Sequence, residues 1–123
     1  MKSWLKLQIE NILKFLEEAD ELLKKGDTIR AAEKLYKAAE ESIRLLSFIL
    51  KLNLEIVDTK SLTDAVFVIS KKLNDDKIPI YWASAISLIT VNLSKEVVED
   101  LRKDVEELVK IADREYIKVL GRG

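Results

Sequence analysis

Residues 26–52 read GDTIRAAEKLYKAAEESIRLLSFILKL, and this stretch decides the fold. Gly26 supplies the left-handed cap that ends a preceding helix, and Asp27 or Thr28 caps the helix that follows. After this turn, apolar residues recur at the spacing of one helical face, while the opposite face is charged. The stretch therefore predicts a long helix over Thr28–Leu52, and the other helices of the chain are expected to pack against it.

The two halves of this predicted helix differ in character. From Thr28 to Arg44 one side is apolar and the other carries Lys, Arg and Glu. From Leu45 to Leu52 the sequence is apolar on nearly every side, and Phe48 occupies the sector that held charges earlier. A helix that is apolar on all sides is buried on all sides. We therefore expect other helices or a second subunit to cover this end.

The rest of the chain predicts four further helices. A first helix over Ser3–Lys25 has a regular apolar stripe, and Trp4 and Leu7 fall outside it. A third helix is predicted from Ser61–Leu62–Thr63–Asp64, which has the pattern of a capping box, to about Asn74. Asn53–Lys60 is then a connector. The stripe of the first helix comprises Leu5, Ile9, Ile12, Leu16, Ala19 and Leu23.

The fourth and fifth helices complete the prediction. The fourth spans about Pro79–Val91; its ISLITV segment has the composition of a strand, but Trp82, Ala85 or Ile86, and Ile89 have helical spacing. The fifth spans about Lys95–Leu120 with Ser94 as its cap, and Gly121–Arg122–Gly123 is expected to be a frayed tail. The sequence thus predicts one all-α domain over residues 1–123: an antiparallel up-and-down bundle of four to five helices, three long and two short.

Composition excludes several classes of protein. The 123 residues contain no cysteine and no histidine, which excludes disulfides, thiolate metal sites and imidazole catalysis. Charged residues make up 35% of the chain, yet the net charge is −1 and neither half is basic, so nothing indicates a nucleic-acid-binding tail. No apolar run could span a membrane, and the N-terminus does not have the pattern of a signal peptide. We expect a cytoplasmic protein, and its richness in Lys, Glu and Ile resembles that of thermophile proteins.

The sequence offers no catalytic, cofactor-binding or metal-binding residues to propose. Asp75–Asp76 could ligate a cation, but such a pair usually forms a turn. The basic stripe Arg30, Lys34, Lys37 and Arg44 could contact phosphates, but Glu33, Glu40 and Glu41 interrupt it, so a solvated face is the better interpretation. Tyr36 and Tyr81 could gate a pocket, although aromatic residues at helical spacing are usually core.

An apolar surface is the strongest functional signal. Phe48 and Leu52 on the second helix, with Tyr81, Trp82 and Leu93 around the fourth, are more apolar area than a small bundle hides easily. Contiguous exposed apolar patches usually mark partners. These five residues are predicted to form a partner or homodimer surface; the alternative is that they pack against one another within one chain.

Two blocks of the sequence resemble the archaeal PaREP family. The first is Gly26–Asp27 followed by AAEKLYKAAEESIRLL, and the second is Trp82, Ala85 and Leu88 followed by an acidic final helix from Ser94 to about Lys110. The family resembles the HEPN-like helical bundles, which often form dimers. Some HEPN-like proteins are ribonucleases that use an Arg and a His across the dimer. Here Ile89 stands where the PaREP pattern has a His, so the resemblance carries no ribonuclease site.

These observations predict a non-catalytic interaction or ligand-binding module of HEPN-like type, without a cofactor. Two alternatives stay open. The first is a nucleic-acid-processing or nucleotide-binding protein whose site is built from Arg, Lys and carboxylates. The second is an adaptor that pairs with a nucleotidyltransferase, as in toxin–antitoxin systems.

Overall fold

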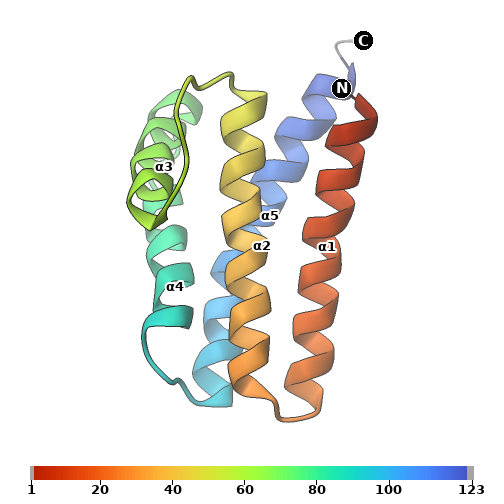
Figure 1. The fold of residues 1–123 in the computed structure, drawn as a ribbon, viewed down its shortest axis with the longest axis vertical. Helices are drawn as coiled ribbons and strands as arrows, with labels where there is room; N and C mark the ends of the chain where they lie inside the picture. The colour runs from red at the N-terminus through yellow and green to blue at the C-terminus, as the bar shows by residue number, and fades with distance from the viewer. Residues whose placement is uncertain (1, 122–123) are drawn as a thin grey trace.

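The computed structural model describes residues 2–121, which contain five helices and their connections. In order they are α1 (Lys2–Lys24), α2 (Thr28–Ile49), α3 (Thr59–Leu73), α4 (Ile78–Thr90) and α5 (Lys95–Gly121). The three long helices α1, α2 and α5 lie side by side, with α1 antiparallel to the other two (Figure 1). The two short helices follow one another along one side of the bundle. The predicted all-α bundle of three long and two short helices is confirmed.

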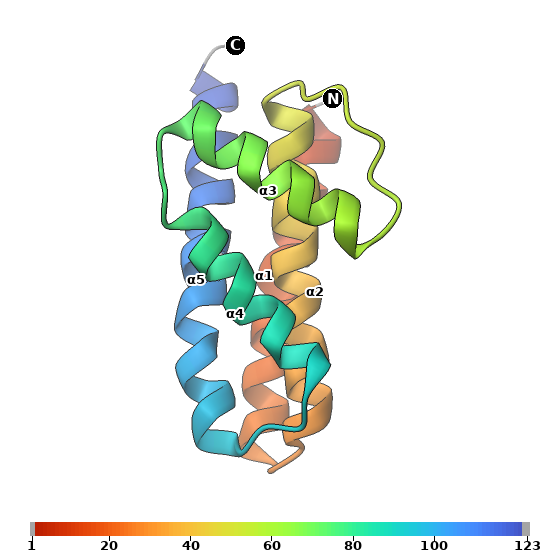
Figure 2. The same ribbon diagram turned by 90° about the vertical axis from the view of Figure 1, so that its left-hand side faces the viewer.

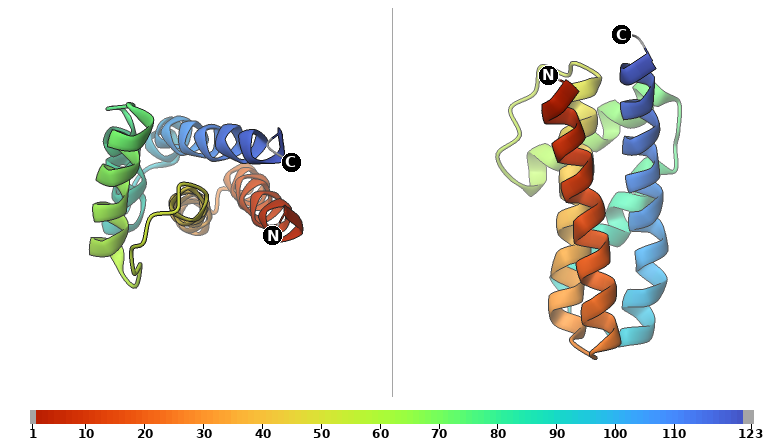
Figure 3. Two further views of the ribbon diagram at one scale, coloured as in Figure 1. Left: turned by 90° about the horizontal axis from the view of Figure 1, so that it is seen from above. Right: turned by 90° about the vertical axis from the view of Figure 1, so that its right-hand side faces the viewer.

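The second helix is the centre of the bundle. It contacts each of the other four helices, whereas α1 contacts only α2 and α5 among the helices. Viewed along the long axis, α2 lies between α1 and the α3–α4 layer (Figure 3). Its residues Leu35, Ala38, Ala39, Ile43 and Leu46 are completely buried. The expectation that the other helices pack against this stretch is therefore confirmed.

The short helices cross the long ones obliquely (Figure 2). α3 packs on α2 and α4, and α4 packs on α2, α3 and α5. Within residues 2–121 no helix combines the length and apolarity that a bilayer crossing requires.

The turn between α1 and α2 follows the sequence prediction. Gly26 has φ +79°, its N–H donates to Leu23 O, and the N–H of Asp27 donates to Leu22 O. These bonds satisfy carbonyls that the end of α1 leaves free. The carboxylate of Asp27 accepts from the N–H of Arg30 at 3.3 Å, so Asp27 caps α2.

The second helix ends three residues earlier than predicted. Lys51 adopts φ +58°, its N–H donates to Phe48 O, and the N–H of Leu52 donates to Ser47 O. This is the same termination motif as at Gly26, but a lysine holds the left-handed position that glycine usually takes. The sequence carried no glycine at this point to mark the end.

The capping box of the third helix lies one turn earlier than predicted. Asp58 accepts from the N–H of Ser61 at 2.9 Å, and the hydroxyl of Ser61 accepts from the N–H of Asp58 at 3.0 Å. Ser61 is therefore the third residue of the helix and not its cap. The predicted box beginning at Ser61 was wrong because the equivalent Asp58–Ser61 pair precedes it. The predicted end is correct, since Asn74 caps α3 with φ +52°.

The ambiguous fourth segment is a helix. Pro79 lies in its first turn and Val91, just past its end, is extended. Its buried face holds Ile78, Trp82, Ala85 and Leu88, whereas Ile89 is exposed and Ile86 is only partly buried. The strand-like composition of ISLITV does not decide the outcome, because α4 buries a continuous helical stripe against α2 and α5.

The remaining boundaries agree with the predictions. α1 and α5 lie within a residue of their expected ranges, and all six residues of the predicted α1 stripe are buried. The hydroxyl of Ser94 accepts from the N–H of Val97 at 3.4 Å at the start of α5. Of the predicted frayed tail, Gly121 belongs to α5, and Arg122 and Gly123 lie outside the described residues.

Candidate interaction surface

Phe48 keeps a free side at the end of α2. Its side chain is 42% exposed, and its ring lies 4.8 Å from the ring of Trp4 on α1, measured between centroids. Leu52 is partly buried just beyond the helix. Leu45, Leu46 and Ser47 are buried, whereas Ile49 and Leu50 are only partly buried, so other helices cover most but not all of the end of α2. In the sequence, Trp4 lies outside the apolar stripe of α1. This position could have indicated that Trp4 contacts another exposed aromatic residue such as Phe48.

Trp82 is a core residue and not part of a surface. It is 2% exposed, its indole Nε1 donates to the hydroxyl of Thr63 at 2.9 Å, and its ring lies 5.8 Å from that of Tyr36. The prediction that placed it on a partner surface does not hold within one chain, because α4 turns this side chain toward α2 and α3. Tyr81, its neighbour, is partly buried against the core.

Tyr36 belongs to the same junction between α2, α3 and α4. It is partly buried, and this burial raises the pKa of its phenol, although a hydrogen bond with the side chain of Thr59 acts in the opposite direction. With Trp82 against its ring, Tyr36 fills the contact between the helices. The groove described below is lined by neither Tyr36 nor Tyr81.

Leu93 lines a groove at the other end of the bundle. The groove has a volume of about 370 Å³ and lies between the start of α2 and the end of α4. Ile29 on α2 is 62% exposed, and on the opposite wall Ile89 and Val91 are 44% and 59% exposed. The groove is lined by Thr28, Ile29, Ala32, Glu33, Leu88, Ile89, Thr90, Val91, Asn92, Leu93 and Val98.

The five predicted residues therefore do not form one surface. Phe48 lies at the end where α1 begins and α5 ends, and Leu93 lies in the α4–α5 connection at the opposite end (Figure 1). Trp82 lies in the core between them. The structure separates an aromatic contact at one end from a groove of mixed polarity at the other.

The groove continues into a surface without charge. Residues 78–94 contain no Asp, Glu, Lys or Arg, although 43 of the 123 residues are of these types, and the next longest uncharged runs, 45–50 and 65–70, have six residues. Only one side of α4 is buried, so the absence of charge extends to its solvent side, where Ile80 is 61% exposed. Charged residues are depleted at the centres of protein interfaces. The length of this uncharged run was visible in the sequence, but which of its residues face solvent was not.

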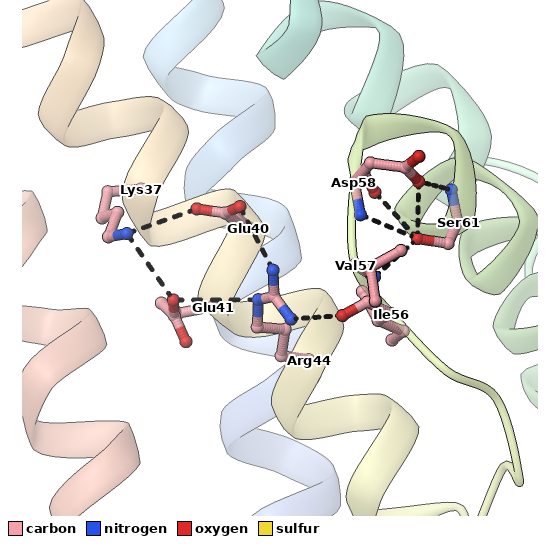
Figure 4. A network of polar contacts seen from close by, with 8 residues as sticks. All are labelled: Lys37, Glu40, Glu41, Arg44, Ile56, Val57, Asp58 and Ser61. Carbon is pink, nitrogen blue, oxygen red and sulfur yellow. Dashed lines mark hydrogen bonds and ion pairs between the residues drawn. The ribbon is translucent and has the colours of Figure 1, made fainter.

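The charged side of α2 is a network of ion pairs (Figure 4). Arg44 lies within 3.5 Å of Glu40 and 4.0 Å of Glu41, and its guanidinium donates to the carbonyl of Ile56 at 3.2 Å. Lys37 lies within 3.5 Å of Glu40. Arg44 thereby fastens the connector before α3 to α2.

The other cations of the predicted basic stripe are paired in the same way. Lys34 pairs with Glu18 of α1 at 3.4 Å, and Arg30 pairs with Asp27 at 3.5 Å. Each of the four cations has a carboxylate partner, so the stripe does not present a field of unpaired positive charge to phosphates. This arrangement supports the solvated face that the sequence predicted.

One ion pair joins α5 to α1. Arg102 of α5 donates two hydrogen bonds to Asp20 of α1, at 2.7 and 3.0 Å, and also pairs with Glu106. The guanidinium of Arg102 holds the pKa of Glu106 below its usual value. Within residues 2–121 no group of three or more carboxylates is placed to hold a metal ion, and Asp75 instead accepts from the N–H of Lys77 in a turn.

Comparison with known proteins gives the family. The model of the archaeal PaREP1/PaREP8 family matches residues 7–109, most of the chain. The chain belongs to the archaeal PaREP1/PaREP8 family. The match includes both blocks that carried the resemblance, and it covers α2, α3 and α4 completely.

Solved structures of similar proteins share the fold. A crystal structure of a protein from Sulfolobus solfataricus is 34% identical, with a TM-score of 0.78, over 85% of this PaREP chain and 95% of that one. A solution structure of the same structural-genomics target, an open-reading-frame protein, is 32% identical, with a TM-score of 0.68 over 85% and 90% of the two chains. Neither description states an activity. No curated protein is significantly similar to the chain.

Proposed function

We propose that this PaREP protein is a non-catalytic interaction module of HEPN-like type that works in the cytoplasm and docks partners on the α4 surface. By the α4 surface we mean the solvent side of residues 78–94 together with the groove beside Ile29. The observation that carries the proposal is the absence of charge over this stretch while Ile80, Ile89 and Val91 are exposed. Removing the solvent side of residues 78–94 from water is favourable, because that side carries no charge of its own. The groove adds one charged residue, Glu33.

The remainder of the molecule supports a binding role over catalysis. The sequence has neither histidine nor cysteine, the two side chains that most often act as base and nucleophile in catalysis. Asp20, Glu40 and Glu106 are paired with basic side chains. The alternative of a nucleic-acid-processing or nucleotide-binding protein is disfavoured because the basic stripe on α2 is neutralised by Glu18, Asp27, Glu40 and Glu41.

Site-specific crosslinking tests this proposal. Because the chain has no cysteine, Ile89→Cys provides one attachment point for a benzophenone maleimide. After irradiation in host extract, we expect defined covalent adducts that excess unlabelled protein suppresses. The matched control is Lys103→Cys on the charged face of α5, which should give none of them. Equal adducts from both positions, or none from Ile89→Cys, would contradict a docking role for the α4 surface.

The same experiment separates the alternatives. Identification of the adduct as a nucleotidyltransferase would favour the adaptor function, and an adduct of twice the chain mass would favour a homodimer. An RNA-binding measurement at low salt is the complementary test, because phosphate contacts strengthen steeply as salt falls. Tight binding that weakens steeply with salt would favour the nucleic-acid alternative instead.

A further inference from the structure

We infer that the groove between the start of α2 and the end of α4 is a binding site for a small aliphatic primary amine in its ammonium form. Such a ligand is a small molecule and requires no protein on the α4 surface, so this site goes beyond the proposed function. Three features of the groove carry the inference: a carboxylate without a basic partner, a helix end without a cap, and a rim of exposed aliphatic side chains.

Glu33 is the charged residue of the groove, and its carboxylate has no basic partner. The other described residues that line the groove are uncharged. No ion pair within residues 2–121 includes Glu33. The three cations closest to it along α2 each pair with another carboxylate: Arg30 with Asp27, Lys34 with Glu18, and Lys37 with Glu40. The groove therefore attracts cations and repels carboxylates and phosphates.

The end of α4 also favours a cation. Its last turn forms the wall opposite α2 (Figure 2), and this turn contains no basic residue. The N–H groups of Leu50 and Asn74 donate to the last carbonyls of α2 and α3, but within residues 2–121 no backbone N–H beyond α4 donates to the carbonyls of its last turn. The carbonyls of an uncapped helix end carry a partial negative charge. Glu33 and the end of α4 thus favour the same kind of ligand from two walls.

The start of α2 borders the groove as well, with the positive end of its dipole. The chain compensates this end itself, because the carboxylate of Asp27 accepts from the N–H of Arg30 at 3.3 Å. The guanidinium of Arg30 in turn pairs with Asp27. Lys95, at the start of α5, lines a separate groove with Asp20. An anion in the groove beside Ile29 would therefore meet no free positive charge.

The polar groups of the groove suit a primary ammonium among the organic cations. A primary ammonium has three N–H donors and no acceptor, so it needs oxygen atoms around it. Side-chain oxygens that accept hydrogen bonds are present on Glu33, Asn92, Thr28 and Thr90. Among the described residues that line the groove, none is aromatic, whereas quaternary ammonium ligands are recognised by aromatic cages. The groove therefore favours a cation with N–H donors over a quaternary one.

The rim of the groove requires a hydrocarbon tail on this ammonium. Ile29, Ile89 and Val91 are exposed there. Covering them with methylene groups is favourable, whereas peptide groups would lose water against them without gaining partners. The volume of about 370 Å³ is near the small end of ligand sites. A free amine with a short alkyl chain fits these walls better than a lysine side chain of a docked protein.

Titration of the purified protein with matched probes tests the site at neutral pH. We expect hexylammonium to shift the backbone amide NMR signals of residues 28–33 and 88–93 in a saturable manner. Hexanol has the same tail without the charge, hexyltrimethylammonium has the charge without N–H donors, and hexanoate has the opposite charge. Each of these should bind at least about fivefold more weakly, because charge-assisted hydrogen bonds are the stronger ones. The amide of N-acetyl-lysine represents a lysine side chain and should also bind more weakly.

A neutral variant of the carboxylate tests the role of Glu33. Glu33→Gln keeps the size of the side chain and removes its charge, so it should weaken hexylammonium binding about five- to tenfold. Glu17→Gln, at an exposed position of α1, is the matched control: it makes the same change in net charge outside the groove and should leave the affinity unchanged. Equal losses in both variants would show only general attraction to an acidic protein and would overturn the inference.

A lysine in the last turn of α4 supplies the cation from the chain itself. Thr90 is exposed and lines the groove. Compared with Thr90→Met, which has a long side chain without charge, Thr90→Lys should raise the thermal midpoint and abolish hexylammonium binding. A midpoint no higher than that of Thr90→Met would show that the end of α4 does not attract a cation, and it would overturn the inference.

The probes also decide between kinds of ligand. Hexanol or hexanoate binding as tightly as hexylammonium would overturn a cation site. Tighter binding of the lysine amide would overturn a free amine as the ligand and point to a lysine of a partner protein. None of these results depends on adducts of Ile89→Cys, so the amine site and the docking role can fail separately.

Discussion

Trp82 on α4 donates a hydrogen bond from its indole Nε1 to the hydroxyl of Thr63 on α3, at 2.9 Å. Nineteen residues separate the two in sequence. The indole is also in contact with Tyr36 of α2, so one side chain joins three helices. In this PaREP protein Trp82 therefore fixes the position of the short-helix layer, and with it the orientation of the α4 surface.

Trp82→Phe should lower the free energy of unfolding by about 1–3 kcal/mol, because it removes a buried hydrogen bond and part of a fully packed ring. Urea unfolding followed by far-UV circular dichroism measures the change. Trp4→Phe is the matched control; Trp4 is exposed, so its replacement should change the free energy by less than about 0.5 kcal/mol. Similar effects at both positions would contradict the role assigned to Trp82.

Arg102→Ala should destabilise the protein by about 1–2 kcal/mol, since it removes the two-pronged contact that joins α5 to Asp20 of α1. The magnitude is limited by the partial exposure of the pair. Lys103→Ala is the control, because the pair of Lys103 with Asp100 is exposed and should contribute less than about 0.5 kcal/mol. Chemical unfolding of the two variants compares them, and a loss at Lys103 as large as that at Arg102 would refute the prediction.

Gly26 and Lys51 both adopt a left-handed backbone conformation just after a helix, and substitution of the two should change the free energy of unfolding in opposite directions. Gly26→Ala should cost roughly 1–2 kcal/mol; a Cβ would meet no atom, but φ +79° is strained for any L side chain. Lys51→Gly should stabilise by roughly 0.5–1 kcal/mol, because relief of the same strain exceeds the added flexibility of the unfolded chain. Thermal unfolding measures both. A stabilising Gly26→Ala would show that the turn relaxes.

Acid should weaken the start of α3. Hydrogen bonds from the backbone and side chain of Ser61 hold the pKa of Asp58 below its usual value. Because the folded pKa is the lower one, this stabilisation is fully present above the unfolded pKa, about 3.9, and is lost as pH falls through the folded pKa. Asp58→Asn should keep the cap but remove this part of the pH dependence. Unfolding measured from neutral to acidic pH compares the two proteins, and identical pH profiles would contradict the prediction.

Arg44→Ala should loosen the connector before α3 and leave the bundle folded. The guanidinium of Arg44 holds the carbonyl of Ile56 and two glutamates of α2. Hydrogen exchange should accelerate in residues 50–58 and in the first turn of α3, with little change in α1. Lys37→Ala, which removes a cation from the same network but no bond to the connector, is the control. Equal acceleration in both variants would assign the effect to the loss of charge.

Helix content and helix faces follow from the sequence by local chemistry. The stripe of α1, the glycine at Gly26 and the cap at Asp27 each act within one or two helical turns, so they can be predicted from the residues beside them. The same locality explains the errors. The predicted end of α2 is three residues too late because a lysine, Lys51, and not a glycine holds the left-handed position. The predicted start of α3 is wrong because two possible capping boxes, one beginning at Asp58 and one at Ser61, lie within one turn of each other.

Which apolar residues face solvent could not be predicted from local sequence patterns. By itself the sequence determined five helices, the central role of α2 and the run without charge at 78–94, because spacing and composition are properties of neighbouring residues. Only the tertiary structure decided that Trp82 is core and Ile80 and Ile89 are exposed, and that Phe48 and Leu93 lie at opposite ends. The reason is physical: α4 is apolar on nearly all sides, so its sequence marks no buried face, and the packing of α2, α3 and α5 selects one.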